Sequence, residues 1–162
     1  MSNNIVHPVG KFANVPRDYK HITAVPLAAA MGAEIRGVDL SKVSDEAFAE
    51  IEDAVYRHKL IIFRDQDISF DDHEKLTLRL GEFGTDAYTK GVKGHENIQP
   101  VIKEATTSTK MVFGSGWHTD SAFLERPPSV ALNYGKDMPP YGGDTMFSNT
   151  VLAYNSLSEG MK

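Results

Sequence analysis

Residues 44–58 have a helical pattern, and a continuous apolar run at 60–63 follows almost directly. These two segments limit the possible folds more than any other feature of the chain. Ser44 is a typical N-cap, and Phe48, Ile51 and Val55 recur at helical spacing, so we expect an amphipathic helix that ends near His58. The run 60–63 is apolar throughout and predicts a buried strand. A helix and a strand of this kind require a packed core, and 162 residues with 41% hydrophobic content can form one in a single domain.

Weaker patterns predict the remaining elements. A second helix is expected from Ser69 to Gly81, with Leu76 and Leu80 on its apolar side. Strands are expected at 32–40, 98–102, 130–134 and 145–147, and a helix-like run at 150–162. Residues 1–20 are expected to form an irregular leader and residues 84–112 a loop or lid. Helices early and strands late predict an α+β fold, with helices flanking a mostly antiparallel sheet.

Composition excludes several classes of function. The chain has no cysteine, which excludes disulfides, thiolate metal sites and a cysteine nucleophile. Its net charge is -5 and its basic residues are scattered, so the electrostatic signature of a nucleic-acid binder is missing. The sequence has no apolar run of signal-peptide or membrane-span length. We therefore expect a cytoplasmic protein with no membrane partner.

The segment Trp117-His118-Thr119-Asp120 contains the residues best suited to chemistry. In an extended strand, His118 and Asp120 project from the same face, so an imidazole and a carboxylate share one space. With a second histidine, such a pair makes the 2-His-1-carboxylate site of Fe(II) oxygenases, which leaves three coordination positions open. A bare H-x-D triplet is a weak signal, because a surface ion pair or an oriented histidine gives the same pattern.

The other candidates have simpler interpretations. We expect His58 to interact with the carbonyls at the end of its helix, and we do not expect His73 or His95 to be metal ligands. Trp117 and Phe123 are typical of a core or a pocket wall. Ser121 has no evident base, so a hydrolase triad is unsupported. The residues 142–145, Gly-Gly-Asp-Thr, predict a tight turn that enters a strand.

Several blocks of residues, taken in their order along the chain, resemble a known family. The blocks are 32–35 with 37–40, 60–66, Phe83-Gly84, 117–120 with Phe123, 126–128, and Pro139 with 142–145. In this order they resemble the Fe(II)/2-oxoglutarate-dependent taurine dioxygenase (TauD/TfdA) family over most of residues 30–160. Several blocks in family order are far more specific than the single H-x-D triplet.

The resemblance implies a double-stranded β-helix (jelly-roll) core with flanking helices, and iron held by His118 and Asp120. It also implies that the Thr145 hydroxyl donates a hydrogen bond to 2-oxoglutarate, and that Tyr88, in the loop after Phe83-Gly84, contacts substrate. The implied reaction is hydroxylation of a small anionic organic compound by O2, with release of succinate and CO2. The cofactors would be Fe(II) and 2-oxoglutarate, and the protein could be a homo-oligomer.

The sequence also departs from the family. His118 is the last histidine and Arg126 the only later arginine, whereas the family places a distal iron-binding histidine and a 2-oxoglutarate-binding arginine well downstream. We therefore expect an N-terminal portion of a single dioxygenase domain that is poorly active and prone to aggregate. Taurine is not the expected substrate, because residues 85–88 and 113–116 lack the histidine and asparagine of sulfonate-binding members. The alternatives are a non-catalytic fragment or interaction protein, and a Zn-dependent hydrolase that uses His118 and Asp120.

Overall fold

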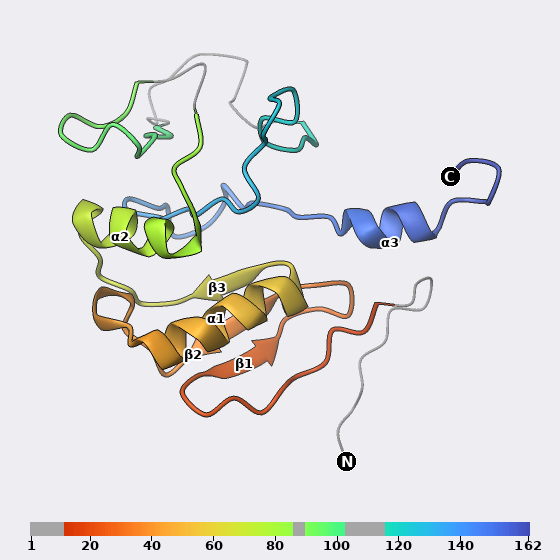
Figure 1. The fold of residues 1–162 in the computed structure, drawn as a ribbon, viewed down its shortest axis with the longest axis horizontal. Helices are drawn as coiled ribbons and strands as arrows, with labels where there is room; N and C mark the ends of the chain where they lie inside the picture. Colours follow the sequence, from red (N-terminus) through yellow and green to blue (C-terminus); the bar gives the residue numbers. More distant parts are fainter. Residues whose placement is uncertain (1–11, 86–89, 103–115) are drawn as a thin grey trace. The chain divides into compact units, whose positions relative to one another are not determined.

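The computed structural model describes residues 12–85, 90–102 and 116–162 (Figure 1). The chain divides into two compact units. The first unit consists of Met1–Asp67 and Asp137–Lys162, and the second of Ile68–Lys136. Each unit is described by itself below.

The first unit contains a three-stranded sheet in the order β1-β2-β3. Its strands are β1 (Thr23–Pro26), β2 (Ala33–Arg36) and β3 (Ile61–Phe63). β1 pairs with β2 in antiparallel register, whereas β2 and β3 are parallel. The sheet is therefore mixed, and the prediction of a mostly antiparallel sheet was too simple. The parallel pair follows from the long helical connection between β2 and β3, since parallel strands need a crossover of this kind.

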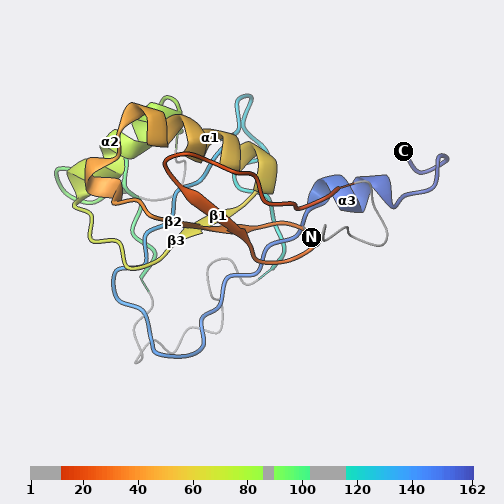
Figure 2. The same ribbon diagram turned by 90° about the horizontal axis from the view of Figure 1, so that it is seen from below.

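The helix α1 (Asp45–His58) is that crossover and covers one face of the sheet (Figure 2). Its predicted limits are confirmed: the Ser44 side chain caps the first turn by accepting from the N–H of Ala47, and Lys59 ends the helix in the left-handed conformation. Phe48, Ile51 and Ala54 of α1 are buried in the core together with side chains of β1 and β2, namely Ala24, Ala33 and Ile35. A short 3-10 helix, η1 (Leu40–Lys42), precedes α1.

The segment before β1, residues 12–22, is irregular but firmly attached to α1. Arg17 and Tyr19 both bind the carboxylate of Asp53, at 3.0 and 2.5 Å. The Glu50 carboxylate accepts from the backbone N–H groups of residues 20–22. These contacts fix the direction from which the chain enters β1.

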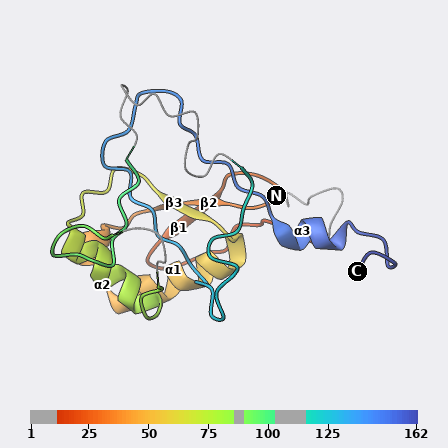
Figure 3. The same cartoon turned by 90° about the horizontal axis from the view of Figure 1, so that it is seen from above.

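The second unit begins with α2 (Phe70–Leu80), whose predicted start at Ser69 is confirmed. Ser69 and Asp72 form a capping box, and Gly81 follows the last helical residue. Leu76 is the buried residue of this helix, whereas Leu80 is half-buried. Figure 3 shows α2 in light green and the irregular segments that follow it.

The late strands predicted from the sequence are absent from the described residues. Segments 98–102, 130–134 and 145–147 are irregular there, and Met146 and Phe147 expose 73% and 50% of their surface. A strand needs a neighbouring strand to pair its backbone N–H and C=O groups, and within the described residues no strand lies beside these segments. The helices and the small sheet agree with the predicted α+β class, but a jelly roll is not formed by the part of the chain that the structure describes.

The helix α3 (Thr150–Asn155) is shorter than the predicted run 150–162. Asn149 begins it and is 7% exposed. Its Oδ1 accepts from the N–H groups of Val151 and Leu152, and its Nδ2 donates to the carbonyl of Ala30 at 2.8 Å. One amide side chain thus caps α3 and ties it to the loop between β1 and β2. Across the described ranges, no helix has the length and apolar character needed to cross a membrane.

Two substitutions separate these roles of Asn149. Asn149→Ser keeps an oxygen for the cap but loses the donor to Ala30, whereas Asn149→Ala loses both. We expect the free energy of unfolding to fall in the order Asn, Ser, Ala, with a total loss of about 1–2 kcal/mol for alanine. Urea unfolding followed by circular dichroism measures both variants. Equal stability of the serine and alanine variants would show that the cap contributes nothing.

Candidate metal centre

His118 and Asp120 lie in a turn of the second unit rather than in a strand. The backbone at Ser121 is left-handed, with φ 49°, and the N–H of Leu124 donates to the carbonyl of Ser121 at 3.0 Å. Asp120 is already a turn residue, and residues 117–119 belong to no strand. The predicted strand is wrong here, because an unpaired segment satisfies its backbone groups more easily in a turn.

The structure nevertheless brings the two predicted ligands together. His118 Nε2 lies 3.1 Å from Asp120 Oδ1, and the side chains are 52% and 60% exposed. Two atoms that occupy adjacent positions of an octahedral ion, with bonds of about 2.1 Å, are separated by about 3.0 Å. The pair therefore has the spacing that one divalent cation requires, and the residues fit an iron ion. The role of the pair as iron ligands stays a prediction, since an ion pair with a protonated His118 has the same geometry.

The second nitrogen of His118 sets the orientation of the ring. Nδ1 lies 2.8 Å from the carbonyl oxygen of Gly116. A carbonyl oxygen can only accept, so Nδ1 carries the proton and Nε2 presents its lone pair toward Asp120 when the ring is neutral. Metal-binding histidines are commonly oriented by this kind of bond.

The same contacts make the site sensitive to protons. The hydrogen bond to Gly116 raises the pKa of His118, and the negative charge of Asp120 adds to the rise. A metal binds the neutral imidazole, so protons compete with it up to a higher pH than for an ordinary histidine. Metal affinity at this pair is therefore expected to fall as the pH is lowered.

The other predicted site residues have different positions. Thr145 is exposed and belongs to the first unit, whereas His118 and Asp120 belong to the second. Gly142 and Gly143 have φ of 80° and 73°, the left-handed conformation that a tight turn favours, but residues 142–145 form neither the predicted turn nor a strand in the described structure. Tyr88 lies outside the described residues.

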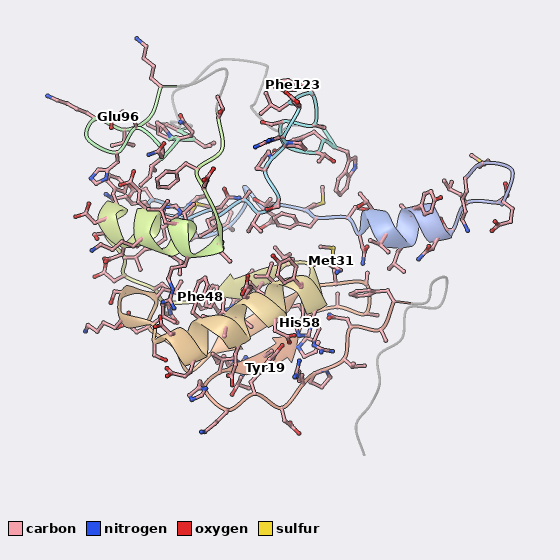
Figure 4. The ribbon with its side chains drawn as sticks, viewed as in Figure 1. Tyr19, Met31, Phe48, His58, Glu96 and Phe123 are labelled. Atoms are coloured by element: carbon pink, nitrogen blue, oxygen red, sulfur yellow. The ribbon has the colours of Figure 1, made fainter. Side chains whose placement is uncertain are left out.

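Two aromatic residues beside the H-x-D motif are not part of the core. Trp117 and Phe123 expose 71% and 62% of their surface, and Phe123 is labelled in Figure 4. Their prediction as core or pocket-wall residues is therefore not met within the described residues. Both side chains lie largely on the surface of the second unit.

A second cluster of possible ligands was missed by the sequence analysis. His95 Nδ1 lies 2.9 Å from Glu74 Oε2 and 3.8 Å from Asp71 Oδ1, and the donor atoms of the three residues lie within 4.8 Å of one another. The spacing of Asp71 and Glu74 on one face of α2 is visible in the sequence, but nothing there indicates that the chain returns with His95. The ring of His95 also contacts Phe70 edge-on, so the cluster attaches the segment 90–98 to α2 without a metal.

His73, on the same helix, has a structural role. Burial lowers the pKa of His73, and a hydrogen bond with the backbone of Leu132 opposes this effect. The ring also packs edge-on against Tyr134. His73 thus holds the segment 132–134 against α2.

Comparison with known proteins identifies the class of protein. The sequence model of the taurine catabolism dioxygenase TauD, TfdA family matches residues 23–162. The chain therefore belongs to this family, as its ordered sequence blocks predicted. The expected cofactors, Fe(II) and 2-oxoglutarate (α-ketoglutarate), are confirmed at the level of the family.

Individual relatives agree with this assignment. An α-ketoglutarate-dependent sulfate ester dioxygenase of Pseudomonas putida is 35% identical over 85% of the chain, and an alkylsulfatase of Acinetobacter baylyi is 31% identical over 84%. The crystal structure of a taurine dioxygenase from Burkholderia xenovorans aligns with a TM-score of 0.71 and 31% identity over 88% of the chain. The chain spans 44% and 42% of the lengths of the first two relatives and 50% of the third.

Proposed function

We propose that His118 and Asp120 are two of the three protein ligands of Fe(II) in a 2-oxoglutarate-dependent dioxygenase. The observation that carries this proposal is the 3.1 Å separation of Nε2 and Oδ1, with Nδ1 held by the Gly116 carbonyl. An imidazole nitrogen and a carboxylate oxygen form the donor set typical of non-haem Fe(II) oxygenases. The exposure of both side chains supports a site that is open to further ligands.

Each residue has a defined task in this proposal. Asp120 supplies negative charge that balances the ion, and Gly116 keeps the lone pair of His118 Nε2 directed at it. The Thr145 hydroxyl donates a hydrogen bond to a carboxylate of 2-oxoglutarate. Bound iron, with 2-oxoglutarate in place, would supply the activation of O2 that no side chain can provide.

The proposed reaction converts a C–H bond, 2-oxoglutarate and O2 into a C–OH bond, succinate and CO2. The substrate class is a small anionic organic compound, and the names of the relatives support this: they concern sulfate esters, sulfonates and phenoxypropionate. Tyr88 is the proposed substrate contact. Taurine itself is not proposed, because residues 85–88 and 113–116 lack the sulfonate-binding pair.

The whole active site requires more polypeptide than this chain. We assign the third ligand, a histidine, and the arginine that binds 2-oxoglutarate to the half of the relatives that the chain does not match. The same half would complete the jelly-roll core, of which residues 1–162 form the N-terminal portion. Residues 84–112 would then be a loop or lid of a single dioxygenase domain.

The proposal is tested on the chain itself, with free imidazole in place of the third ligand. Under anaerobic conditions, Fe(II) and 2-oxoglutarate are added with increasing imidazole. We expect a visible charge-transfer band of the Fe(II)–keto-acid chelate that strengthens as imidazole is added. No band at any imidazole concentration would contradict the proposal and favour a non-catalytic fragment.

Two controls separate the remaining alternatives. Zn(II) in place of Fe(II) gives no such band, and ester hydrolysis by the Zn(II)-loaded chain would favour the hydrolase instead. The variant His95→Gln disrupts the cluster of Asp71, Glu74 and His95 on α2. We expect this variant to keep the band, whereas its loss would assign iron to that cluster.

A further inference from the structure

His58 is a fully buried histidine at the C-terminal end of α1, where Figure 4 labels it. Its Nδ1 lies 2.5 Å from Oδ1 of Asn14, which is also fully buried. The Nδ2 of Asn14 donates to the carbonyls of Ala28 and Gly32, at 2.7 and 2.8 Å. Through this pair, the segment before β1, the β1–β2 loop and α1 meet at one point. The predicted contact of His58 with carbonyls of its own helix is therefore wrong.

The bonds of Asn14 determine which nitrogen of His58 carries the proton. Both Asn14 Nδ2 hydrogens are used by carbonyl oxygens, so the amide oxygen faces His58 and must accept. Nδ1 of His58 is then the protonated nitrogen of a neutral ring. Nε2 is left with a lone pair.

Nε2 is the unusual atom of this arrangement. It is buried and has no hydrogen-bond partner among the described residues. A second proton would create a buried N–H and a positive charge without an acceptor, which is costly in the protein interior. Burial accordingly lowers the pKa of His58; the nearby Arg57 lowers it further, and Asp53 opposes the effect.

Three titratable groups near this point, Asp53, Glu50 and Tyr19, have pKa values shifted away from the mildly acidic range. The hydrogen bond from Tyr19 lowers the pKa of Asp53. Burial tends to raise the pKa of Glu50, but the hydrogen bonds from the backbone of residues 20–22 and from the His21 ring outweigh it, so the pKa is lowered. Burial and the bond to Asp53 raise the pKa of Tyr19 to about 12. Arg17 and Arg57 both pair with Asp53, and the loop 27–32 has no titratable side chain.

We propose that His58 and Asn14 form a proton-sensitive latch, in which uptake of a proton at Nε2 releases residues 12–22 from α1 and from the β1–β2 loop. The released state gives the imidazolium access to water, which the closed state denies it. No chemical step other than protonation is involved.

The direction of the pH effect follows from the lowered pKa of His58. In the open state His58 has an ordinary pKa near 6.5, so it takes up a proton at a higher pH than in the closed state. The latch is therefore fully stable above that pH, and its stability falls as the pH drops through the lowered pKa of the closed state. One coupled proton changes the opening equilibrium by at most about tenfold per pH unit.

Hydrogen exchange of the full chain between pH 7 and 5 tests the latch. The reporters are the amides of Lys20, His21 and Ile22, which donate to Glu50 in the closed state. After correction for the intrinsic exchange rate, we expect their protection to be constant above about pH 6.5 and to fall below it, by up to about tenfold per unit. Protection that is unchanged down to pH 5 would overturn the proposal.

Matched histidine variants identify the group responsible. In His58→Gln, the amide can still donate to Asn14 but cannot titrate, so we expect protection that does not depend on pH. His21, whose ring pairs with Glu50 at 3.1 Å in the same segment, provides the control, and His21→Gln should keep the dependence on pH. The reverse pattern in these two variants would contradict the latch.

A measurement on the unsubstituted chain covers the case in which His58→Gln does not fold. Nitrogen-15 NMR of the imidazole rings reports the tautomer and its titration. We expect His58 to be the Nδ1–H tautomer at pH 7, and to become protonated at the pH at which the amide protection is lost. A protonated His58 with the segment still protected would refute the proposal.

Discussion

Replacing His118 by alanine is expected to abolish the charge-transfer band that Fe(II) and 2-oxoglutarate give with this chain. The substitution removes the imidazole of the His118–Asp120 pair, whose Nε2 lies 3.1 Å from Asp120 Oδ1 and is the nitrogen ligand in the proposal. Loss of a residue that merely orients a ligand weakens metal binding by about 10–100-fold, so loss of the ligand itself should exceed about 100-fold. Anaerobic titration followed by visible absorption gives the two affinities.

A histidine of the first unit provides the control for this experiment. His21 has an exposed ring that pairs with Glu50, and His21→Ala should leave the band unchanged. Asp120→Asn keeps the shape of the side chain but removes its charge, so we expect an intermediate loss. An unchanged spectrum in His118→Ala would exclude the pair as the iron site.

Replacing Ile51 by alanine is expected to produce the largest loss of stability among the substitutions considered. Ile51 is 3% exposed and lies on the face of α1 that packs in the core with Ala33 and Ile35. Removing a buried isoleucine down to Cβ costs about 2–5 kcal/mol, because apolar burial is lost and a cavity remains. Urea unfolding followed by the circular dichroism of the helices gives the change in free energy of unfolding.

Tyr56 provides a matched control on the same helix. It is also a large side chain, but it is 60% exposed. Because substitutions at exposed positions usually change stability by no more than about 0.5 kcal/mol, Tyr56→Ala should be nearly neutral. Equal losses in the two variants would mean that α1 does not pack through the face that contains Ile51.

The local signals in the sequence located the first part of the fold well. Ser44 with its acidic first turn, and Ser69 with Asp72, are caps whose hydrogen bonds run to residues within three positions, so the helix starts follow directly from the residues. The strand at 60–63 was recognised, although β3 is half-buried rather than buried. The short β1 was not predicted, because four residues that end in Pro26 give little pattern.

The local sequence patterns did not predict the structure correctly where an element depends on a partner that is distant in the chain. Residues 130–134 and 145–147 have strand-forming composition, yet they are irregular in the described structure, because composition does not provide a neighbouring strand. His58 illustrates the same limit at a single side chain. Its position on the helix was predicted, but its bond to Asn14, forty-four residues away, was not.

The sequence by itself determined the limits of α1 and the H-x-D motif, because these depend on residues close together in the chain, and it determined the family, because the order of the blocks along the chain is visible without a structure. Only the tertiary structure decided that Nε2 of His118 faces Asp120 from a turn, that His95 meets Glu74, and that His58 has a buried nitrogen without a partner in the described residues. These contacts depend on how separate segments pack and turn. Local propensity contains no information about that packing.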